Sequence, residues 1–364
     1  MEASLYLPIY LAITSSMAFL YGFRYISSTG YTLQVQKSSI WLPLLISVIF
    51  VIWIGNRPIN SAYFGDTGNY ALSYAKTLAD SQIHVDLQSE WGWQLLMVTC
   101  KKLGLDIHVF FTIVEAGYIF SALWATKKFM PTNPMLGMLF LFTSLMFFTF
   151  GTNGIRNGLA CHILLLGMAF MFEIKIIIGA LLCLVAFSIH RSVMLPISAM
   201  VLGMFLLKKY QIAVSLWFGA ILLSLAFGNS FINFFASLGF DDRMGAYNTS
   251  VYNADFSHTG FRWDFLLYSS MPIIMGWYVL IEKGIKDRWY EVLCITYTLC
   301  NAFWVLVIRA AFSNRFAYLS WFIYPIIIAY PLVNLPTWSD QDRKTGLILL
   351  AYSGFSLFMW TFYW

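Results

Sequence analysis

Long apolar runs, separated by short polar breaks, constrain this chain more than any other feature of its sequence. Each run approaches the roughly 20 residues that an α-helix needs to cross the hydrocarbon core of a bilayer. Hydrophobic residues make up 60% of the chain and charged residues only 11%, whereas about 25% of the residues in soluble domains are charged. The strands of an outer-membrane barrel would alternate weakly instead. The chain is therefore predicted to be an all-α, polytopic integral membrane protein.

About twelve transmembrane helices are predicted from these runs. They cover approximately residues 3–23, 40–55, 107–126, 134–150, 154–172, 175–189, 192–207, 211–228, 264–282, 289–308, 316–333 and 345–364. The first run lacks a basic n-region and a small-residue cleavage site, so we expect it to be kept as a spanning helix. Because the sequence has no long linker and no evident internal repeat, residues 1–364 are interpreted as a single helical bundle domain.

The segment 90–105 does not fit this series of spanning helices. Counting it as a span would reverse the predicted side of every later loop. Its two tryptophans, Trp91 and Trp93, and its terminal Lys101 and Lys102 are typical of a helix at the headgroup boundary. We therefore predict a short interfacial or re-entrant helix near 90–105.

Basic residues in alternate loops predict the orientation of the chain, because cytoplasmic loops carry an excess of lysine and arginine. The loops assigned to the cytoplasm contain Arg24, Lys37, Lys127, Lys128, Lys175, Lys208, Lys209, Lys283, Lys286, Arg288, Arg343 and Lys344. Both termini and the two larger loops, 56–106 and 229–263, then lie outside. In a bacterial cell that is the periplasmic face of the inner (cytoplasmic) membrane. This topology accounts for the net charge of +5, so no nucleic-acid partner is expected.

A second set of basic residues lies at the outer ends of the predicted spans, where arginine is uncommon and needs a partner. The set contains Arg57, Arg156, Arg191, Arg243, Arg262, Arg309 and Arg315. The forked guanidinium suits phosphate or diphosphate oxygens, and the helix N-terminus beside Arg156 also favours an anion. We interpret the set as a lipid-phosphate site. The alternative is that each arginine pairs with a loop carboxylate or a lipid headgroup.

Two residues on the same face are candidates for proton transfer. Asp66 could act as a general base or hold a sugar, and the alternative is that it caps a helix that begins near Thr67. His190 has a side chain suited to proton transfer, and the alternative is a structural role. Glu115, inside an apolar run, is either a structural hydrogen-bonding group or the partner of an arginine. No acidic cluster has the spacing of divalent-metal ligands, so we expect neither a metal nor a cofactor.

The order of these motifs resembles the EpsG family. The motifs are "R…GDTxxY" (Arg57, Gly65, Asp66, Thr67, Tyr70), "SEWGW" with Glu90, "GIRNGLA" with Arg156, "FSIHRS" with His190 and "NRFAYL" with Arg315. That family belongs with the Wzy-type polymerases of O-antigen and exopolysaccharide, and a GT-C-like bundle is expected. The family pattern has RQ where this chain has Arg156 and Asn157, which puts the second contact in doubt.

The resemblance implies a glycosyltransferase on the periplasmic face. A glycan on undecaprenyl diphosphate would be transferred to a hydroxyl of another lipid-linked repeat unit, with membrane lipids and a chain-length regulator protein as further partners. Asp66 or His190 would take the acceptor proton. The residues assigned to the diphosphate are Arg57, Arg156, Arg191, Arg309 and Arg315, and those assigned to the glycan are Tyr70, Glu90, Asn157, Arg243, Arg262 and Asp264.

Other functions compatible with this pattern are an O-antigen ligase, another periplasmic glycosyl or acyl transferase, and a flippase or transporter of the lipid-linked sugar. A ligase usually has a larger outer loop than 229–263. A transporter should carry charges through the bundle to both faces and often has inverted repeats, whereas mid-span charge here is nearly limited to Glu115. The sequence therefore favours the polymerase.

Overall fold

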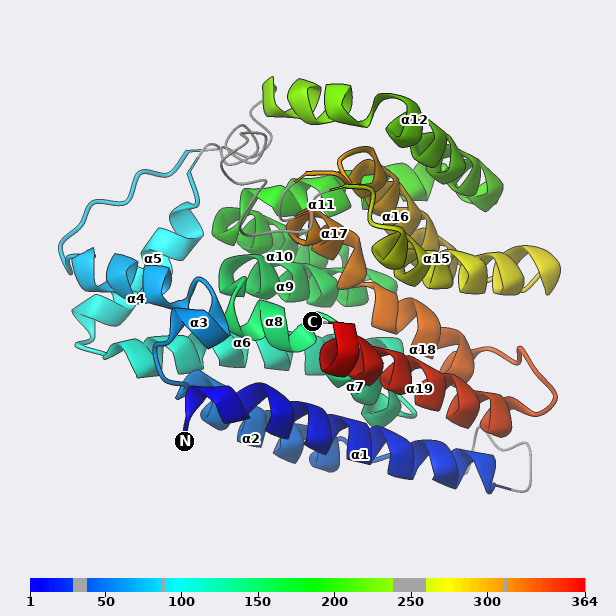
Figure 1. Cartoon of the computed structure of the whole chain (residues 1–364), viewed down its shortest axis with the longest axis horizontal. Helices are drawn as coiled ribbons and strands as arrows, with labels where there is room; N and C mark the ends of the chain where they lie inside the picture. Colours follow the sequence, from blue (N-terminus) through cyan, green and yellow to red (C-terminus); the bar gives the residue numbers. More distant parts are fainter. Residues whose placement is uncertain (29–37, 87–88, 238–259, 311–312, 364) are drawn as a thin grey trace. The chain divides into compact units, whose positions relative to one another are not determined.

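The computed structural model describes residues 1–28, 38–86, 89–237, 260–310 and 313–363. Every regular element among these residues is a helix (Figure 1). Seven helices are long and apolar enough to cross a membrane, namely Ala3–Ile26, Ile107–Phe129, Ile155–Phe172, Tyr210–Gly228, Trp263–Glu282, Asn314–Asn334 and Gln341–Phe362. The all-α, polytopic membrane class is thus confirmed, whereas the count of about twelve spans and the GT-C-like bundle stay predictions.

Several predicted spans are shorter or interrupted in the structure. The shorter apolar helices are α2 (Trp41–Gly55), α10 (Ile176–Ile189) and the segment Arg191–Phe205. The run predicted at 134–150 is divided into α7 (Pro134–Phe142) and α8 (Phe147–Thr152). Asn133 and Pro134 explain where α7 begins, because the Asn133 side chain accepts from the Leu136 N–H and proline is favoured in a first turn.

The short helix expected near 90–105 is α5 (Trp91–Lys102). Its 12 residues extend about 18 Å, which is too short to cross the hydrocarbon core. Its interfacial or re-entrant placement stays a prediction.

The described residues form two compact units. Unit 1 contains Met1–Val193 and Ala329–Trp364, and unit 2 contains Met194–Ile328. The interpretation of the chain as a single bundle domain stays a prediction.

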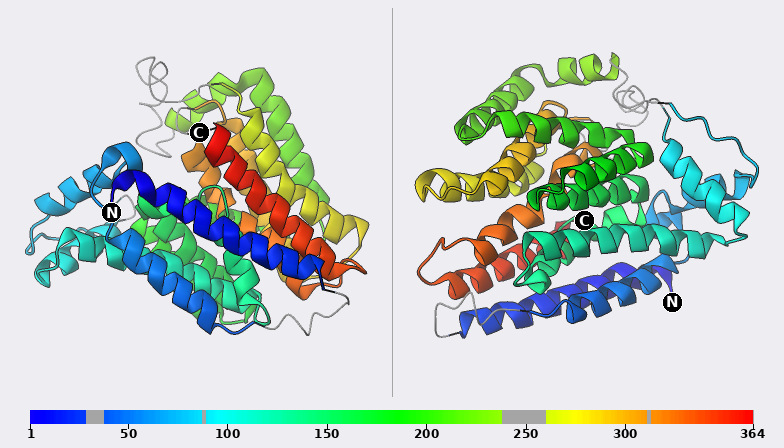
Figure 2. Two further views of the ribbon diagram at one scale, coloured as in Figure 1. Left: turned by 60° about the horizontal axis from the view of Figure 1, so that its bottom comes forward. Right: turned by 180° about the vertical axis from the view of Figure 1, so that it is seen from behind.

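Unit 1 is built around α6 (Ile107–Phe129), which packs on α2 and on α9 (Ile155–Phe172). Helix α9 in turn packs on α10, and α1 (Tyr6–Ile26) lies along α19 (Gln341–Phe358), as Figure 2 shows. Small residues permit the close approach of α1 and α19, because a Cβ added to Gly346 would lie 2.4 Å from the Gly22 carbonyl oxygen. The remaining elements of this unit are α3 (Ser61–Phe64), α4 (Thr67–Lys76), the 3₁₀ turns Ala3–Leu5 and Arg191–Val193, α18 (Tyr324–Asn334) in part, and Met359–Tyr363.

Unit 2 is centred on α16 (Arg288–Leu306). The helices that pack on it are α11 (Met194–Phe205), α12 (Tyr210–Ser237), α15 (Trp263–Trp277) and α17 (Asn314–Trp321), and a π-helical turn, Tyr278–Glu282, follows α15. Two hydrogen bonds link side chains inside this core: Trp217 Nε1 donates to Asn301 Oδ1 at 2.8 Å, and Asn301 Nδ2 donates to Ser320 Oγ at 3.1 Å.

Candidate functional site

A carboxylate in front of α5 joins two basic side chains at one end of unit 1. Glu90 Oε1 lies 2.5 Å from His190 Nδ1, and Glu90 Oε2 forms an ion pair with Arg156 Nη1. The Arg191 backbone N–H also donates to this carboxylate. The side chains of Glu90, Arg156 and His190 are only 19%, 22% and 23% exposed. Glu90 thus lies at the centre of a cluster, and the glycan contact that the family resemblance implies for it stays a prediction.

The local fold explains why three distant residues meet. Arg156 lies in the first turn of α9, and His190 directly follows α10; a three-residue loop makes these helices antiparallel neighbours, so both residues lie at the same end. Gly92 brings α5 to that end, since a Cβ there would lie 2.1 Å from Ser188 Oγ and 3.0 Å from the Ser188 carbonyl carbon. The sequence signal for this contact is the glycine of "SEWGW", whose role we did not predict.

The electrostatics of the cluster keep Glu90 ionised. Burial alone would raise the pKa of Glu90, but the hydrogen bond and charge of His190 and the charge of Arg156 lower that pKa overall. Because a carboxylate accepts hydrogen bonds, Nδ1 of His190 carries the proton toward Glu90. Nε2 is then the ring nitrogen of His190 that does not face Glu90.

Aromatic and acidic groups surround the Arg156 guanidinium. Its central carbon lies 5.6 Å from the centre of the Tyr70 ring, and Tyr70 makes an edge contact with Trp93 at 5.8 Å. The negative charge of Asp66 also acts on this guanidinium. Arg156 therefore lies where Asp66, Tyr70 and Glu90 converge.

Asp66 occupies the position before α4, yet its side chain makes no capping hydrogen bond. Asp66 Oδ1 accepts from Asn69 Nδ2 at 3.2 Å instead, and the Asp66 backbone N–H donates to Asn153 Oδ1 at 2.8 Å. Gly65, with a φ of 52°, lies so close to Asn153 that a Cβ would approach the Asn153 amide within 2.4 Å. Asp66 thus occupies the N-cap position of α4, but the prediction that its side chain caps this helix is wrong.

Arg57 is a buried link between helices and not a surface residue. It is 1% exposed, and it donates from Nη1 to the Ile54 carbonyl and from Nη2 to the Thr152 carbonyl, both at 3.1 Å. The Thr152 carbonyl also accepts from Thr67 Oγ1 at 2.9 Å. Burial lowers the pKa of Arg57 to about 10 although the charge of Glu115 raises it. These contacts favour a structural role for Arg57 over the predicted diphosphate contact.

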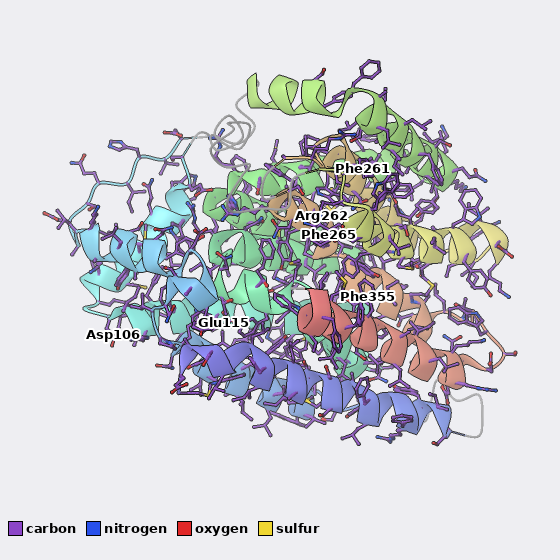
Figure 3. The ribbon with its side chains drawn as sticks, in the orientation of Figure 1. Asp106, Glu115, Phe261, Arg262, Phe265 and Phe355 are labelled. Carbon is purple, nitrogen blue, oxygen red and sulfur yellow. The ribbon has the colours of Figure 1, made fainter. Side chains whose placement is uncertain are left out.

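Glu115 is also buried, with 1% of its surface exposed, and Figure 3 labels it within the bundle. Its Oε1 has no hydrogen-bond partner among the described residues, and a Cβ at Gly151 would lie 2.9 Å from this oxygen. No ion pair within 4.0 Å joins the described side chains of Glu115 and Arg57. Both interpretations that we considered for Glu115 thus remain predictions.

The other predicted site residues are distributed as follows. In unit 2, Arg262 makes a forked ion pair with Asp264 at 2.9 and 2.6 Å and lies 3.7 Å from the Phe265 ring centre (Figure 3). Arg309 lies 5.9 Å from the Phe261 ring centre, and Arg315 is in the first turn of α17.

Two further predicted site residues lie in unit 1. Arg191 begins the 3₁₀ turn after His190, and buried Asn157 accepts a hydrogen bond from Cys161 Sγ at 3.2 Å. Arg243 lies outside the described residues.

The cluster therefore combines the predicted Asp66, Tyr70, Glu90, Arg156 and His190 in unit 1. It offers an arginine for an anion and a histidine oriented by a carboxylate. Among the described residues, no group of three or more His, Cys, Asp and Glu side chains is placed to hold a metal ion.

Comparison with known proteins gives one match. The model of the EpsG family matches residues 40–364, which is nearly the whole chain. Neither a curated protein nor a solved structure matches. Because this match covers well over half of the chain, the chain belongs to the EpsG family, a family of Wzy-type polymerase-like membrane proteins.

Proposed function

We propose that this protein polymerises a polysaccharide by transferring a glycan from undecaprenyl diphosphate to a hydroxyl of another lipid-linked repeat unit. The observation that carries the proposal is the Glu90 carboxylate held between Arg156 and His190, in a membrane protein of this family. The reaction would occur at the outer face of the bacterial inner membrane, as the distribution of lysines predicts.

The transfer is balanced in atoms and charge. The bond between the anomeric carbon and the diphosphate oxygen breaks, and a new glycosidic bond forms from that carbon to the acceptor oxygen. The acceptor hydroxyl loses its proton to a base, and the lipid diphosphate leaves with the electrons of the broken bond. The chemistry therefore needs a proton acceptor on one side and positive charge beside the departing diphosphate on the other.

His190 is the better candidate for the base. Its Nδ1 is engaged by Glu90, which leaves Nε2 to take the acceptor proton, while the carboxylate stabilises the imidazolium that forms. Asp66 has a hydrogen bond from Asn69, and its charge acts on Arg156. We therefore assign Asp66 to positioning Arg156 or the acceptor sugar.

Arg156 is the candidate for the diphosphate. One of its terminal nitrogens is paired with Glu90, and its Nε has no hydrogen-bond partner among the described residues. An arginine already aligned by a carboxylate can stabilise the negative charge that grows on the leaving group. When no substrate is bound, the Glu90 carboxylate compensates the positive charge of the partly buried Arg156 guanidinium.

The test is extension of synthetic undecaprenyl-diphosphate-linked repeat units by the purified full chain in lipid nanodiscs. The parent should produce a ladder, and His190→Ala should reduce the rate about 100- to 10,000-fold because the general base is lost. Lys175→Ala, which alters an exposed cation at the opposite end of α9, should extend at the parent rate.

Three outcomes contradict parts of the proposal. No ladder from a folded parent argues against a polymerase, and transfer to a lipid A core acceptor instead would identify a ligase. A ladder that survives His190→Ala but disappears with Asp66→Asn would make Asp66 the base. Melting temperatures of all variants are measured alongside, so that a loss of folding is separated from a loss of chemistry.

A further inference from the structure

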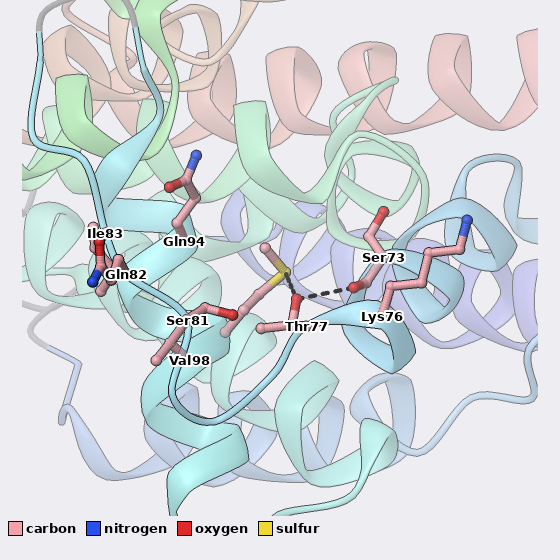
Figure 4. A pocket seen from close by; sticks show the side chains of 9 residues that line it. Ser73, Lys76, Thr77, Ser81, Gln82, Ile83, Gln94 and Val98 are labelled. Carbon is pink, nitrogen blue, oxygen red and sulfur yellow. Dashed lines mark hydrogen bonds between the residues drawn. The ribbon is translucent and has the colours of Figure 1, made fainter.

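A cavity with a mixed polar and apolar lining lies between α4, α5 and the segment that joins them. Its volume is about 290 Å³, close to the lower end of the range for small-molecule sites. From α4 it is lined by Ser73 and Lys76, and from α5 by Gln94 and Val98 (Figure 4). The cavity is separate from the cluster described above, since none of its nine lining residues belongs to that cluster.

Helix geometry makes the cavity a neighbour of the Glu90 cluster. Gln94 is one turn after Glu90, since its backbone N–H donates to the Glu90 carbonyl at 3.1 Å. Ser73 is three residues after Tyr70 and therefore lies one turn further on the same face of α4. Tyr70 and Trp93, in edge contact at 5.8 Å, connect the two helices where the cluster begins. The cavity thus continues the surface that starts at Tyr70 and Glu90.

The walls of the cavity are held in place by buried aromatic side chains. Tyr74 of α4 stacks on Phe110 of α6 at 4.7 Å, and Trp93 of α5 meets the same ring at 5.4 Å. Thr77 Oγ1 donates to the Ser73 carbonyl at 2.9 Å and approaches Met97 Sδ at 3.9 Å, which links the end of α4 to α5. Two helices that are both fixed to α6 provide a preformed site.

The lining chemistry suits a sugar. Hydroxyl and amide side chains, including Ser73, Ser81 and Gln94, can pair with sugar hydroxyls, and the side chains of Ser73 and Gln94 make no hydrogen bond to another described residue. Apolar groups such as Val98 can lie against the C–H face of a pyranose ring. Lys76 is the one charged side chain among the nine described lining residues, so an acidic sugar is accepted better than a basic one.

We propose that this cavity binds a sugar residue of the acceptor glycan and so presents the acceptor hydroxyl to the Glu90, Arg156 and His190 cluster. The proposal rests on the proposed polymerase function. It assigns to the acceptor the surface between α4 and α5, and it leaves the diphosphate of the donor to Arg156.

The experiment measures binding, independently of polymerisation. The probe is the repeat-unit oligosaccharide released by mild acid from the lipid-linked precursors of the strain that carries this gene. Its dissociation constant for the full chain in nanodiscs is determined by calorimetry. Ser73→Trp, which fills the cavity, should weaken binding at least tenfold, and Gln94→Ala should weaken it about 2- to 10-fold because one hydrogen bond is lost.

Matched controls are available on the same helices. Leu72→Trp places the same bulky side chain on an exposed neighbouring position that does not line the cavity, and Thr99→Ala truncates an exposed residue of α5. Both variants should bind the oligosaccharide as the parent does. If Ser73→Trp lowers the melting temperature, Gln94→Ala decides the result.

The outcomes separate this inference from the proposed function. Parent-like binding by both Ser73→Trp and Gln94→Ala, or no binding by the parent, would overturn the sugar site even if the ladder assay succeeds. Weakened binding by these variants in a protein that makes no ladder would leave the sugar site standing and remove the polymerase. In an active protein, Gln94→Ala should raise the KM for the acceptor oligosaccharide and leave kcat within about twofold.

Discussion

Unit 1 contains two glutamates that each lie between two basic side chains, near opposite ends of α9. Glu90 meets Arg156 and His190 near the first turn of α9. Glu173, directly after α9, lies 2.7 Å from Lys128 Nζ and 3.2 Å from Lys175 Nζ. The 18 residues of α9 extend about 27 Å. One helix therefore carries the same arrangement of charge at both ends.

The two ends differ in burial and in the type of base. The Glu90 side chain is 19% exposed and that of Glu173 is 36% exposed. Of the two lysines beside Glu173, Lys128 is 16% exposed and Lys175 is 53% exposed, so only the pair with Lys175 is exposed on both sides. Exposed pairs are screened and contribute little to stability, whereas partly buried groups interact strongly and depend on one another. Lysines at the Glu173 end suffice for orientation in the membrane, while arginine and histidine at the Glu90 end add directional hydrogen bonding and proton transfer.

The largest expected difference between the two ends follows from exchanging the type of cation. Arg156→Lys keeps the charge but loses the planar pair of donors. The activation free energy of extension should therefore rise by about 2 to 5 kcal/mol, which lowers the extension rate roughly 30- to several-thousand-fold. Lys128→Arg at the other end should extend at the parent rate. The nanodisc ladder assay measures both, and an active Arg156→Lys variant would remove the diphosphate role of Arg156.

A smaller effect is expected from neutralising each glutamate. Glu90→Gln leaves His190 without its orienting carboxylate, and the extension rate should fall at least about 10- to 100-fold, the loss found when the group that orients a metal-bound histidine is removed. Glu173→Gln should change the rate less than about twofold and the free energy of unfolding by less than about 1 kcal/mol. The comparison fails if the two variants have equal rates.

The smallest effect concerns the pH dependence of stability. The pKa of Glu90 is lowered in the folded protein, so ionised Glu90 adds to the free energy of unfolding. This contribution is fully present above the unfolded pKa of about 4.3 and is lost as the pH falls through the lower folded pKa. The melting temperature of the parent should therefore fall below about pH 4.3 more steeply than that of Glu90→Gln. In 0.5 M salt this difference should persist, whereas a difference between the parent and Glu173→Gln should disappear because exposed pairs are screened. Parallel melting curves for the parent and Glu90→Gln would contradict this.

Individual residues mark the limits of prediction from sequence. His190 and Arg156 could be predicted as candidates because each interrupts an apolar pattern at a helix end. The outward role of Arg57 was predicted by the same argument, but its guanidinium is buried against the carbonyls of Ile54 and Thr152. Charge and position in a sequence do not reveal whether a side chain at a span end points to solvent or back into the bundle.

The sequence by itself determined the membrane class, the approximate positions of the helices and the family, because apolar runs of sufficient length have no other stable arrangement in lipid. Only the tertiary structure decided which polar residues meet. Gly92 allows α5 to approach α10, and this contact places Glu90 beside His190 and Arg156, which are 100 and 66 residues away in the chain. The periodicity of a sequence predicts which face of a helix is apolar, whereas the helix that packs on that face depends on the packing of many side chains at once.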